Sequence, residues 1–158
     1  RQAITLRDLT EDTLRRLRPL AETKNQRIRF SAQDDCPLFA DATRLQQAIY
    51  NIVDNAIKYS PENETIRVTL EQRGKTAVLE IADHGPGIPA KDQPHIFDRF
   101  YRVDKARARA TGGNGLGLSI AHQAVLLHDG ALTVRSEEGK GTTFRMELSI
   151  STQTGEER

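Results

Sequence analysis

The sequence predicts a single α+β domain in which helices pack on one face of an antiparallel or mixed β-sheet. Its 158 residues are enough for one domain with its own core. One segment carries an unbroken helical stripe of apolar residues, and two pairs of alternating, β-branched segments are each joined by a glycine-containing turn. Strands grouped in hairpins favour an antiparallel or mixed sheet, which amphipathic helices then cover.

The first forty residues alternate between extended and helical patterns. The predicted elements are a strand over Gln2–Leu9, a helix over Thr10–Asn25, a strand over Arg27–Ala32 and a loop over Asp34–Ala40. The helix has an apolar side that we expect to face the core, formed by Leu14, Leu17, Leu20 and Ala21. Pro19 should kink this helix or loosen a turn, because proline has no backbone N–H.

Thr43–Tyr59 is the clearest helix in the sequence. Its apolar residues recur at the spacing of one helical face and are Leu45, Ala48, Ile49, Ile52, Val53, Ala56 and Ile57. The turn-forming sequence Ser-Pro-Glu-Asn ends it at residues 60–63. The alternating segments Thr65–Gln72 and Ala77–Ala82 then predict a β-hairpin with its turn around Gly74.

A long connection and a second helix and hairpin complete the chain. Asp83–Asn114 is rich in proline and charge, and we expect one regular piece in it, a short helix near Gln93–Arg102. The elements expected after it are a buried helix over Leu116–His128 and a hairpin of Gly130–Glu137 and Thr142–Ile150. The domain is expected to span residues 1–150, with residues 151–158 as a disordered polar tail.

Composition excludes several classes of protein. The net charge of +1 lacks the overall basicity of a nucleic-acid-binding domain. Cys36 is the single cysteine, so no disulfide can form within the chain, and we expect a half-buried thiol. No apolar run approaches the roughly 20 residues of a membrane span, and residues 1–20 lack the layout of a signal peptide. We therefore expect a cytoplasmic segment without direct membrane contact, with any anchor of its parent protein outside it.

A polar row runs along the Thr43–Tyr59 helix beside its apolar stripe. Asn51 and Asn55 are one turn apart, and Lys58 and Tyr59 continue the row by another turn. An amide oxygen is an uncharged ligand suited to Mg²⁺, which also uses substrate phosphates, and a nearby lysine can balance phosphate charge. The alternative is a solvated polar helix face.

Two glycine-containing motifs flank the long connection. Asp83 follows the strand Ala77–Ala82 within Asp-His-Gly-Pro-Gly-Ile-Pro, where a carboxylate can accept a hydrogen bond from an exocyclic amine; a plain turn is the alternative. Gly-Gly-Asn-Gly-Leu-Gly, residues 112–117, precedes a helix whose first N–H groups can meet an anion; a flexible hinge loop is the alternative. The basic run between them, from Lys91 to Arg109, suits phosphate neutralisation or forms a solvated charged surface.

In their order along the chain, these motifs resemble those of the catalytic ATP-binding domain of bacterial sensor histidine kinases. This domain shares the Bergerat (GHKL) fold with gyrase, Hsp90 and MutL ATPases. NIVDNAIKYS resembles the N box, DHGPGIP the G1 box, IFDRFYR the F box and GGNGLGLSI the G2 box, and the likeness covers nearly the whole chain. The resemblance implies an α/β sandwich with a mixed, mostly antiparallel sheet, helices on one face, and a long ATP lid over about residues 90–114.

The resemblance also implies roles for individual residues, with ATP and Mg²⁺ as cofactors. In the N box, Asn55 would be the principal Mg²⁺ ligand, and Asn51 would support the ion or a phosphate. Lys58 would contact phosphate, and Tyr59 would line the nucleotide pocket. In the G1 box, Asp83 would accept the adenine amino group, in a slot shaped by Gly85, Gly87 and Ile88. Arg102 would approach the γ-phosphate and, with Asn51, act in catalysis. The phosphates would be held by the G2 residues Gly113, Gly115, Leu116, Gly117 and Leu118.

One position separates the two branches of this fold. Hydrolysing members carry a glutamate as general base four residues before the Mg²⁺-binding asparagine, and here that position is Asn51, whose amide cannot take up a proton at neutral pH. The resemblance therefore favours transfer of the γ-phosphate to a histidine over an ATPase of the gyrase type. A non-catalytic nucleotide-binding domain is the other alternative.

The implied phosphoacceptor is a histidine outside this chain. None of the four histidines, His84, His95, His122 and His128, lies in the family's phosphoacceptor sequence, so each is expected to be structural or exposed. The implied partners are a dimerisation and phosphoacceptor domain of the parent protein and the receiver domain of a response regulator. No nucleic acid is expected as a partner.

Overall fold

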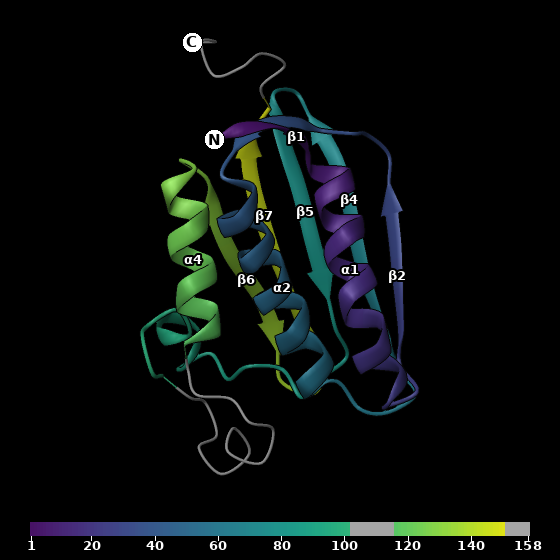
Figure 1. Ribbon diagram of the computed structural model, residues 1–158. Helices are drawn as coiled ribbons and strands as arrows, with labels where there is room; N and C mark the ends of the chain where they lie inside the picture. Colours follow the sequence, from purple (N-terminus) through teal and green to yellow (C-terminus); the bar gives the residue numbers. More distant parts are fainter. Residues whose placement is uncertain (102–115, 151–158) are drawn as a thin grey trace.

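In a computed structural model, the chain is described over residues 1–101 and 116–150 (Figure 1). The strands in these ranges are β1 (Gln2–Thr5), β2 (Arg27–Ala32), β3 (Pro37–Ala40), β4 (Thr65–Arg73), β5 (Thr76–Ala82), β6 (Ala131–Glu137) and β7 (Gly141–Ser149). The helices are α1 (Leu6–Glu22), α2 (Ala42–Tyr59), α4 (Gly117–Leu127) and the short 3₁₀ helix η1 (Gln93–His95).

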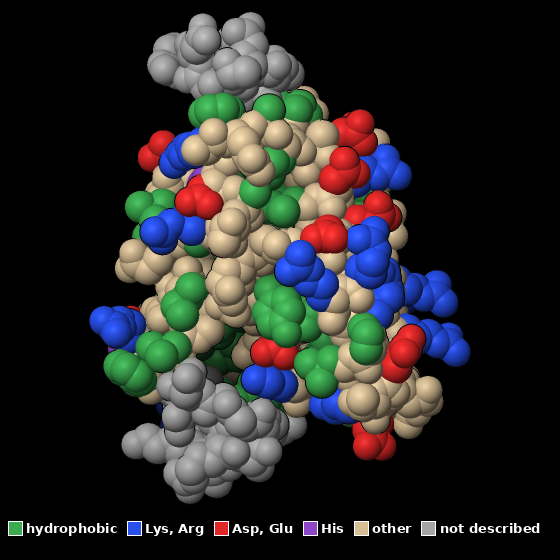
Figure 2. Space-filling view, viewed as in Figure 1, with side chains coloured by type: hydrophobic (Ala, Val, Ile, Leu, Met, Phe, Trp, Pro, Cys, Tyr) green, Lys and Arg blue, Asp and Glu red, His purple; other side chains and the backbone are tan. Residues whose placement is uncertain are grey.

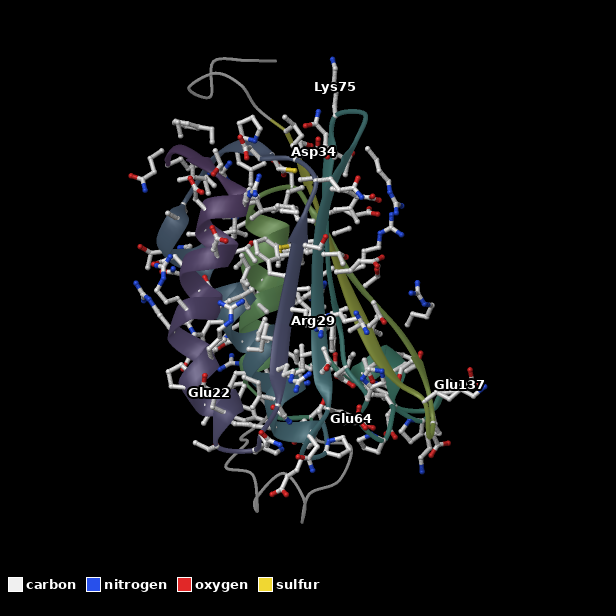
Figure 3. The ribbon with its side chains drawn as sticks, turned by 90° about the vertical axis from the view of Figure 1, so that its right-hand side faces the viewer. Glu22, Arg29, Asp34, Glu64, Lys75 and Glu137 are labelled. Atoms are coloured by element: carbon white, nitrogen blue, oxygen red, sulfur yellow. The ribbon has the colours of Figure 1, made fainter. Side chains whose placement is uncertain are left out.

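Five of the strands form one sheet in the spatial order β2-β4-β5-β7-β6. β2 and β4 are parallel, and the other three neighbouring pairs are antiparallel. The helices α1, α2 and α4 lie side by side on one face of this sheet, and no described helix covers the other face (Figures 1 and 3). This arrangement confirms the predicted sandwich with a mixed, mostly antiparallel sheet.

The core lies between the three helices and the sheet. The complete apolar stripe predicted for α2 is buried there, from Leu45 to Ile57. From the sheet it meets fully buried side chains that include Leu70, Leu79 and Phe144. Burial of a leucine- or phenylalanine-sized side chain contributes about 1.5–3 kcal/mol, so this contact layer accounts for the placement of α2 against the sheet.

The first forty residues differ most from the sequence-based expectations. The expected strand over residues 2–9 ends at Thr5, because the Thr5 hydroxyl accepts a hydrogen bond from Asp8 N at 3.2 Å and caps a helix that starts at Leu6. The expected loop over residues 34–40 contains β3, which pairs antiparallel with β1 in a separate two-stranded sheet. Its partner lies at the beginning of the chain, so no local pattern revealed it.

Two side chains in this region are placed differently from the prediction. Leu20 is 41% exposed, although Leu17 and Ala21 beside it are buried, so it lies at the margin of the core-facing side of α1. Cys36 is completely buried, where a half-buried thiol was expected. Burial and the nearby carboxylates of Asp34 and Asp35 raise the pKa of this thiol to about 11.

The helix expected near residues 93–102 is only one 3₁₀ turn, Gln93–His95. Phe100 has a φ of +66°, which a right-handed helix cannot contain. Residues 102–114 of the predicted lid and the predicted tail over residues 151–158 lie outside the described part of the chain.

Candidate functional site

Four elements bring the predicted site residues to one end of the molecule. The C-terminal ends of α2 and β5, the turn between β6 and β7, and the N-terminal end of α4 all lie at the lower end of Figure 1. Asn51 of α2 and Gly117 of α4 are 66 positions apart, yet the asparagine Nδ2 donates to the glycine carbonyl oxygen at 3.1 Å. The N-box helix and the start of the last helix are therefore in direct contact.

Asp83 lies directly after β5 and is only 8% exposed. Its Oδ1 accepts two backbone hydrogen bonds, from Gly85 N at 2.8 Å and from Thr142 N at 3.2 Å. No described residue donates a hydrogen bond to its Oδ2. Burial raises the pKa of this carboxyl group above its usual range, and the two backbone N–H groups oppose that rise. The site thus contains a fixed carboxyl group with one acceptor oxygen still available.

The loop after Asp83 is fixed by residues that the sequence analysis did not single out. Ile88 N donates to Ser136 Oγ at 2.7 Å, and that hydroxyl lies 2.8 Å from Thr142 Oγ1. Gln93 Nε2 donates to the carbonyl oxygens of Ile88 at 2.9 Å and Ser136 at 3.1 Å. These contacts join segments 43 and 48 positions apart, and the strand pattern of β6 and β7 gave no signal for them.

Close approach explains the two glycines of this loop. A Cβ added to Gly85 would lie 2.8 Å from the carbonyl oxygen of Tyr59, so any side chain would push the loop away from the end of α2. Gly87 has a φ of +81°, and a Cβ there would lie 2.3 Å from the carbonyl oxygen of Glu137. Both glycines are required by the packing of the loop between α2 and the β6–β7 hairpin.

The polar row of α2 is partly buried, and its members have different partners. Asn51 uses both ends of its amide, because its Oδ1 also accepts from Gln47 Nε2 at 2.9 Å. Asn55, one turn further, makes no hydrogen bond with a described residue, so its amide is available. Lys58 Nζ lies 3.2 Å from a carboxylate oxygen of Asp54. The geometry ties Asn51 to the packing of α2 against α4, whereas Asn55 keeps its amide free of described contacts.

The end of α2 is held by the turn between α1 and β2. Lys24 Nζ donates to three carbonyl oxygens, those of Ile57 at 2.8 Å, Lys58 at 3.2 Å and Ser60 at 2.9 Å. Gln26 Nε2 donates to the same region, at Ile57, Ser60 and Pro61. A cation at a helix C-terminus also complements the partial negative charge of the helix dipole. This cap fixes the turn that carries Lys58 and Tyr59.

The last helix begins at Gly117, with Leu116 as its N-cap residue. The first N–H groups of an α-helix have no acceptor within the helix, so this end suits an anion. Leu118 packs against the core and fixes the first turn. Gly117 itself has no left-handed φ, and a Cβ there would make only ordinary contact with Asn51 at 3.8 Å. Neither backbone conformation nor close packing therefore requires a glycine at this position.

Arg102, Gly113 and Gly115 lie outside the described residues. Of the F box, Phe97 stacks on His122 of α4 with ring centroids 4.6 Å apart, and it meets Phe144 of β7 edge-on at 6.2 Å. Phe97 therefore holds this segment against the domain. Phe100, three residues further on, does not, since it is 62% exposed.

The described residues could supply only some of the ligands of a Mg²⁺ ion, so water and a bound nucleotide would have to supply the others. In residues 1–101 and 116–150 no group of three or more His, Cys, Asp and Glu side chains forms a metal cage. The available amide of Asn55 fits a magnesium ion that takes most of its ligands from water and from substrate phosphates. The donor set is therefore compatible with a metal that enters together with a nucleotide.

A family model described as histidine kinase-, DNA gyrase B- and HSP90-like ATPase matches residues 40–152, which is more than half of the chain. The chain belongs to this ATPase family. The matched range contains all the predicted site residues, including Asn55 and Asp83.

The relatives of this ATPase domain are histidine kinases. It is 50% identical over 103 residues to the signal transduction histidine-protein kinase ArlS of Staphylococcus aureus. The aligned region covers 65% of this chain and 23% of ArlS. The match therefore spans about a quarter of the length of the curated relatives.

Solved structures extend the likeness to nearly the whole chain. The mycobacterial sensor histidine kinase MprB superposes with a TM-score of 0.84 at 29% identity, over 96% of this chain and 99% of MprB. The catalytic domain of histidine kinase ThkA gives 0.82 at 27% identity, over 94% of each chain. Full-length ShkA, solved in complex with AMPPNP, gives 0.79 at 25% identity, over 96% of this chain and 32% of ShkA. The chain therefore has the GHKL fold that is found in histidine kinase catalytic domains.

Across residues 1–101 and 116–150, no helix combines the length and the apolar character needed to cross a bilayer.

Proposed function

We propose that this chain binds ATP with Mg²⁺ and donates the γ-phosphate to a histidine on a separate dimerisation and phosphoacceptor domain. The observation that carries the proposal is the buried carboxyl group of Asp83, with Oδ1 held by two backbone N–H groups and Oδ2 without a described partner. A buried acceptor of this kind selects a ligand that donates a hydrogen bond at this position, because a ligand without a donor leaves it unpaired. The adenine amino group is such a donor.

The other site residues would hold the rest of the nucleotide. Tyr59 and Ile88 flank the loop of Asp83 and would line the ring. Lys58 would contact phosphate, and Asn55 would bind the Mg²⁺ that bridges the phosphates. The N-terminus of α4, from Leu116 to Leu118, would meet phosphate oxygens through backbone N–H groups. Arg102, Gly113 and Gly115 are proposed to complete this end of the site.

Asn51 favours transfer to a histidine over hydrolysis. Its amide cannot act as a general base on water, and both its ends are hydrogen-bonded to described groups. An imidazole nitrogen is itself a nucleophile. It would attack the γ-phosphorus while the bond to the β–γ bridging oxygen breaks, so that ADP leaves and phosphohistidine forms. Positioning and charge neutralisation then supply most of the catalysis.

The acceptor histidine is proposed to belong to another domain because none of the four histidines here lies in the family's phosphoacceptor sequence; two are packed within the fold and two are exposed. His128 Nε2 accepts from Asp41 N at 3.0 Å, and its Nδ1, which the geometry makes the protonated nitrogen, donates to Ala124 O at 2.7 Å. His122 stacks on Phe97. His84 and His95 lie beside Thr65 O and an aspartate carboxylate, respectively.

The proposed setting is a two-component pathway. The partners would be the phosphoacceptor domain of the same parent protein and the receiver domain of a response regulator, without nucleic acid. Residues 1–150 would form the catalytic domain, with a lid over about residues 90–114 and a tail over residues 151–158. The parent protein would be a membrane sensor of which this segment is a cytoplasmic part.

Two measurements test the proposal in sequence. Calorimetric titration of the chain with Mg-ATP should give saturable binding, and adding γ-labelled ATP with the parent's phosphoacceptor domain should label that domain in an acid-labile form. A phosphoacceptor domain with its histidine replaced by glutamine is the matched control and should stay unlabelled. Binding without label transfer would favour a non-catalytic nucleotide-binding domain, and sustained phosphate release by the chain alone would favour an ATPase.

A further inference from the structure

The face of the sheet opposite the helices carries a second group of charged side chains, one of which, Arg67, is paired in register with Ala82, next to Asp83. Figure 3 views the molecule from its β2 edge and shows the helices on one side of the sheet only. In the parallel pairing of β2 with β4, Arg29 lies directly beside Arg67, and Ser31 beside Thr69. All four side chains are exposed, whereas the residues between them on each strand point toward the helices.

The arginines of this face lack acidic partners. Neither Arg29 nor Arg67, nor the neighbouring Arg27, forms an ion pair or a side-chain hydrogen bond with another described residue. The nearest carboxylate on β5 in register is Glu80, opposite Thr69, and it already lies 3.8 Å from Arg145. On the side of Figure 2 where α1 and β2 lie, Lys and Arg side chains are interspersed with Asp and Glu. The positive charge without a described ion-pair partner is that of Arg27, Arg29 and Arg67 on the two strands.

Protection of an edge strand explains only part of this pattern. Charged side chains on an edge strand such as β2 discourage pairing with other chains, which accounts for Arg27 and Arg29. Arg67 lies on β4, which is paired on both sides and needs no such protection. Arg29 and Arg67 thus place two guanidinium groups beside each other without an acidic partner among the described residues, and an anion between them would reduce their repulsion.

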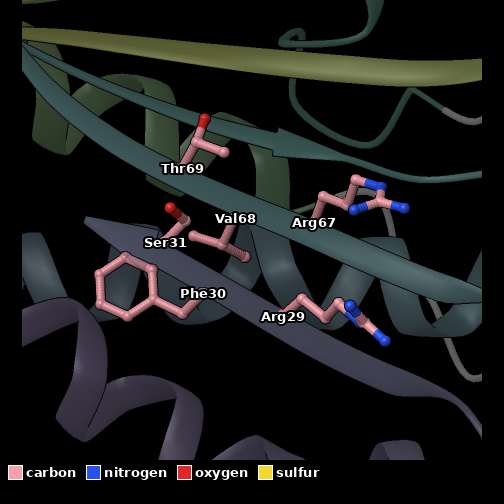
Figure 4. Close-up of a pocket in the computed structure, with 6 residues that line it drawn as sticks. All are labelled: Arg29, Phe30, Ser31, Arg67, Val68 and Thr69. Atoms are coloured by element: carbon pink, nitrogen blue, oxygen red, sulfur yellow. The ribbon is translucent and has the colours of Figure 1, made fainter. Parts of the chain in front are cut away.

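A shallow hollow that is widely open to solvent lies at these strands, lined by Arg29, Phe30, Ser31, Arg67, Val68 and Thr69. Figure 4 shows the two guanidinium groups extending in the same direction from adjacent strands, with the hydroxyl groups of Ser31 and Thr69 further along the same strands. Residues two apart on a strand are separated by about 6.6 Å. The hollow therefore presents two cations at one end and two hydroxyl groups at the other, about the length of a small polar molecule.

We propose that this hollow binds a small phosphorylated molecule, with Arg29 and Arg67 on its phosphate and Ser31 and Thr69 on its polar body. Guanidinium groups present paired N–H donors that match the oxygens of a phosphate, and two of them together balance its double charge. The hydroxyl groups select a ligand with hydrogen-bonding groups beyond the phosphate. This site is separate from the proposed nucleotide site and does not depend on it.

The test uses glycerol 3-phosphate as the probe, with inorganic phosphate and glycerol as comparison ligands. The chain is titrated in the presence of Mg²⁺ and AMPPNP, so that any phosphate-binding capacity of the proposed nucleotide site is occupied. NMR shifts of the β2 and β4 backbone amides report binding. We expect saturation with a dissociation constant of about 1 mM, typical of a small ligand with few contacts. Inorganic phosphate should bind more weakly, and glycerol should not bind.

Arg29→Gln and Arg67→Gln should each weaken the binding about tenfold. Arg135→Gln is the matched control, because Arg135 is an exposed arginine on β6, at the opposite edge of the same sheet. It should leave the dissociation constant unchanged. All three positions are exposed, and circular dichroism establishes that each variant is folded. Absence of saturation below about 50 mM, or equal affinity of the wild type and both arginine variants, would overturn the proposal. Binding of a glutamate-rich peptide in place of the probe would also overturn it, in favour of an acidic protein partner.

Discussion

Replacement of Asp83 by asparagine separates the binding role of this residue from its structural role. Asparagine has nearly the same shape as aspartate. Its Oδ1 can still accept hydrogen bonds from the backbone N–H groups of Gly85 and Thr142, which lie 2.8 and 3.2 Å from Asp83 Oδ1 in the wild type. What changes is the other oxygen, because the NH₂ donor of asparagine replaces the acceptor Oδ2. If the adenine amino group donates to Oδ2, Asp83→Asn removes a hydrogen bond to a charged acceptor. It also places the NH₂ group of asparagine against the adenine amino group, so that two donors face each other.

The expected loss follows from the value of that bond. A hydrogen bond to a charged group is worth about 1.5–3 kcal/mol, which corresponds to a 10- to 150-fold rise in the dissociation constant of Mg-ATP. Calorimetry measures this change directly. Asp129→Asn is the control, since it makes the same charge change at an exposed position at the far end of α4. Its affinity for Mg-ATP should equal that of the wild type.

Stability should move in the opposite direction. Burial raises the pKa of Asp83, so the protonated form is more favourable in the folded than in the unfolded chain at the same pH. The stability that Asp83 contributes is therefore fully present below the unfolded pKa of 3.8 and is lost as pH rises through the folded pKa. Asparagine carries no charge at any of these pH values. The free energy of unfolding of Asp83→Asn should equal or exceed that of the wild type at pH 7, and the excess should shrink toward acidic pH.

Urea unfolding at several pH values measures this excess. Unchanged affinity for Mg-ATP would refute the assignment of Oδ2 to the adenine amino group. A loss of affinity together with an equal loss of stability would show that the substitution disrupts the loop, and the binding argument would fail.

Three further predictions concern the scaffold around the site. Lys24→Met removes the cap of α2 and should lower the free energy of unfolding in urea by about 1–3 kcal/mol, whereas Lys75→Met at an exposed turn should have no effect. Gly85→Ala should lower the free energy of unfolding by about 1–3 kcal/mol, because its Cβ would meet the backbone carbonyl of Tyr59. The free energy of unfolding of Gly117→Ala should lie within about 1 kcal/mol of the wild-type value. Equal effects of the two substitutions would contradict the packing of Gly85. The Cys36 thiol, with its pKa raised to about 11, should react with a disulfide reagent at pH 8 about a hundredfold more slowly than a free cysteine, and fast labelling of the folded chain would show that it is not buried.

The sequence by itself determined the elements with a strong local period. The stripe from Leu45 to Ile57 specifies α2 because an α-helix repeats every 3.6 residues, and the structure buries every member of it. Both hairpins follow from alternation and turn glycines, and the family follows from four motifs in order. The roles of Asn55 and Asp83 as ligand groups remain predictions based on chemical type and spacing.

Only the tertiary structure decided the contacts between distant segments. β3 depends on β1, which lies about 35 residues earlier, and the parallel pairing of β2 with β4 spans the whole of α2. Three other features also depend on residues far apart in the sequence: the hydrogen bonds from Lys24 to the end of α2, the hydrogen bond that holds the Asp83 loop to Ser136, and the pairing of Arg29 with Arg67. Local periods arise from backbone geometry within a few residues, so they can be recognised in the sequence. Contacts between segments depend on how several elements pack at once, and no single stretch of sequence contains that information.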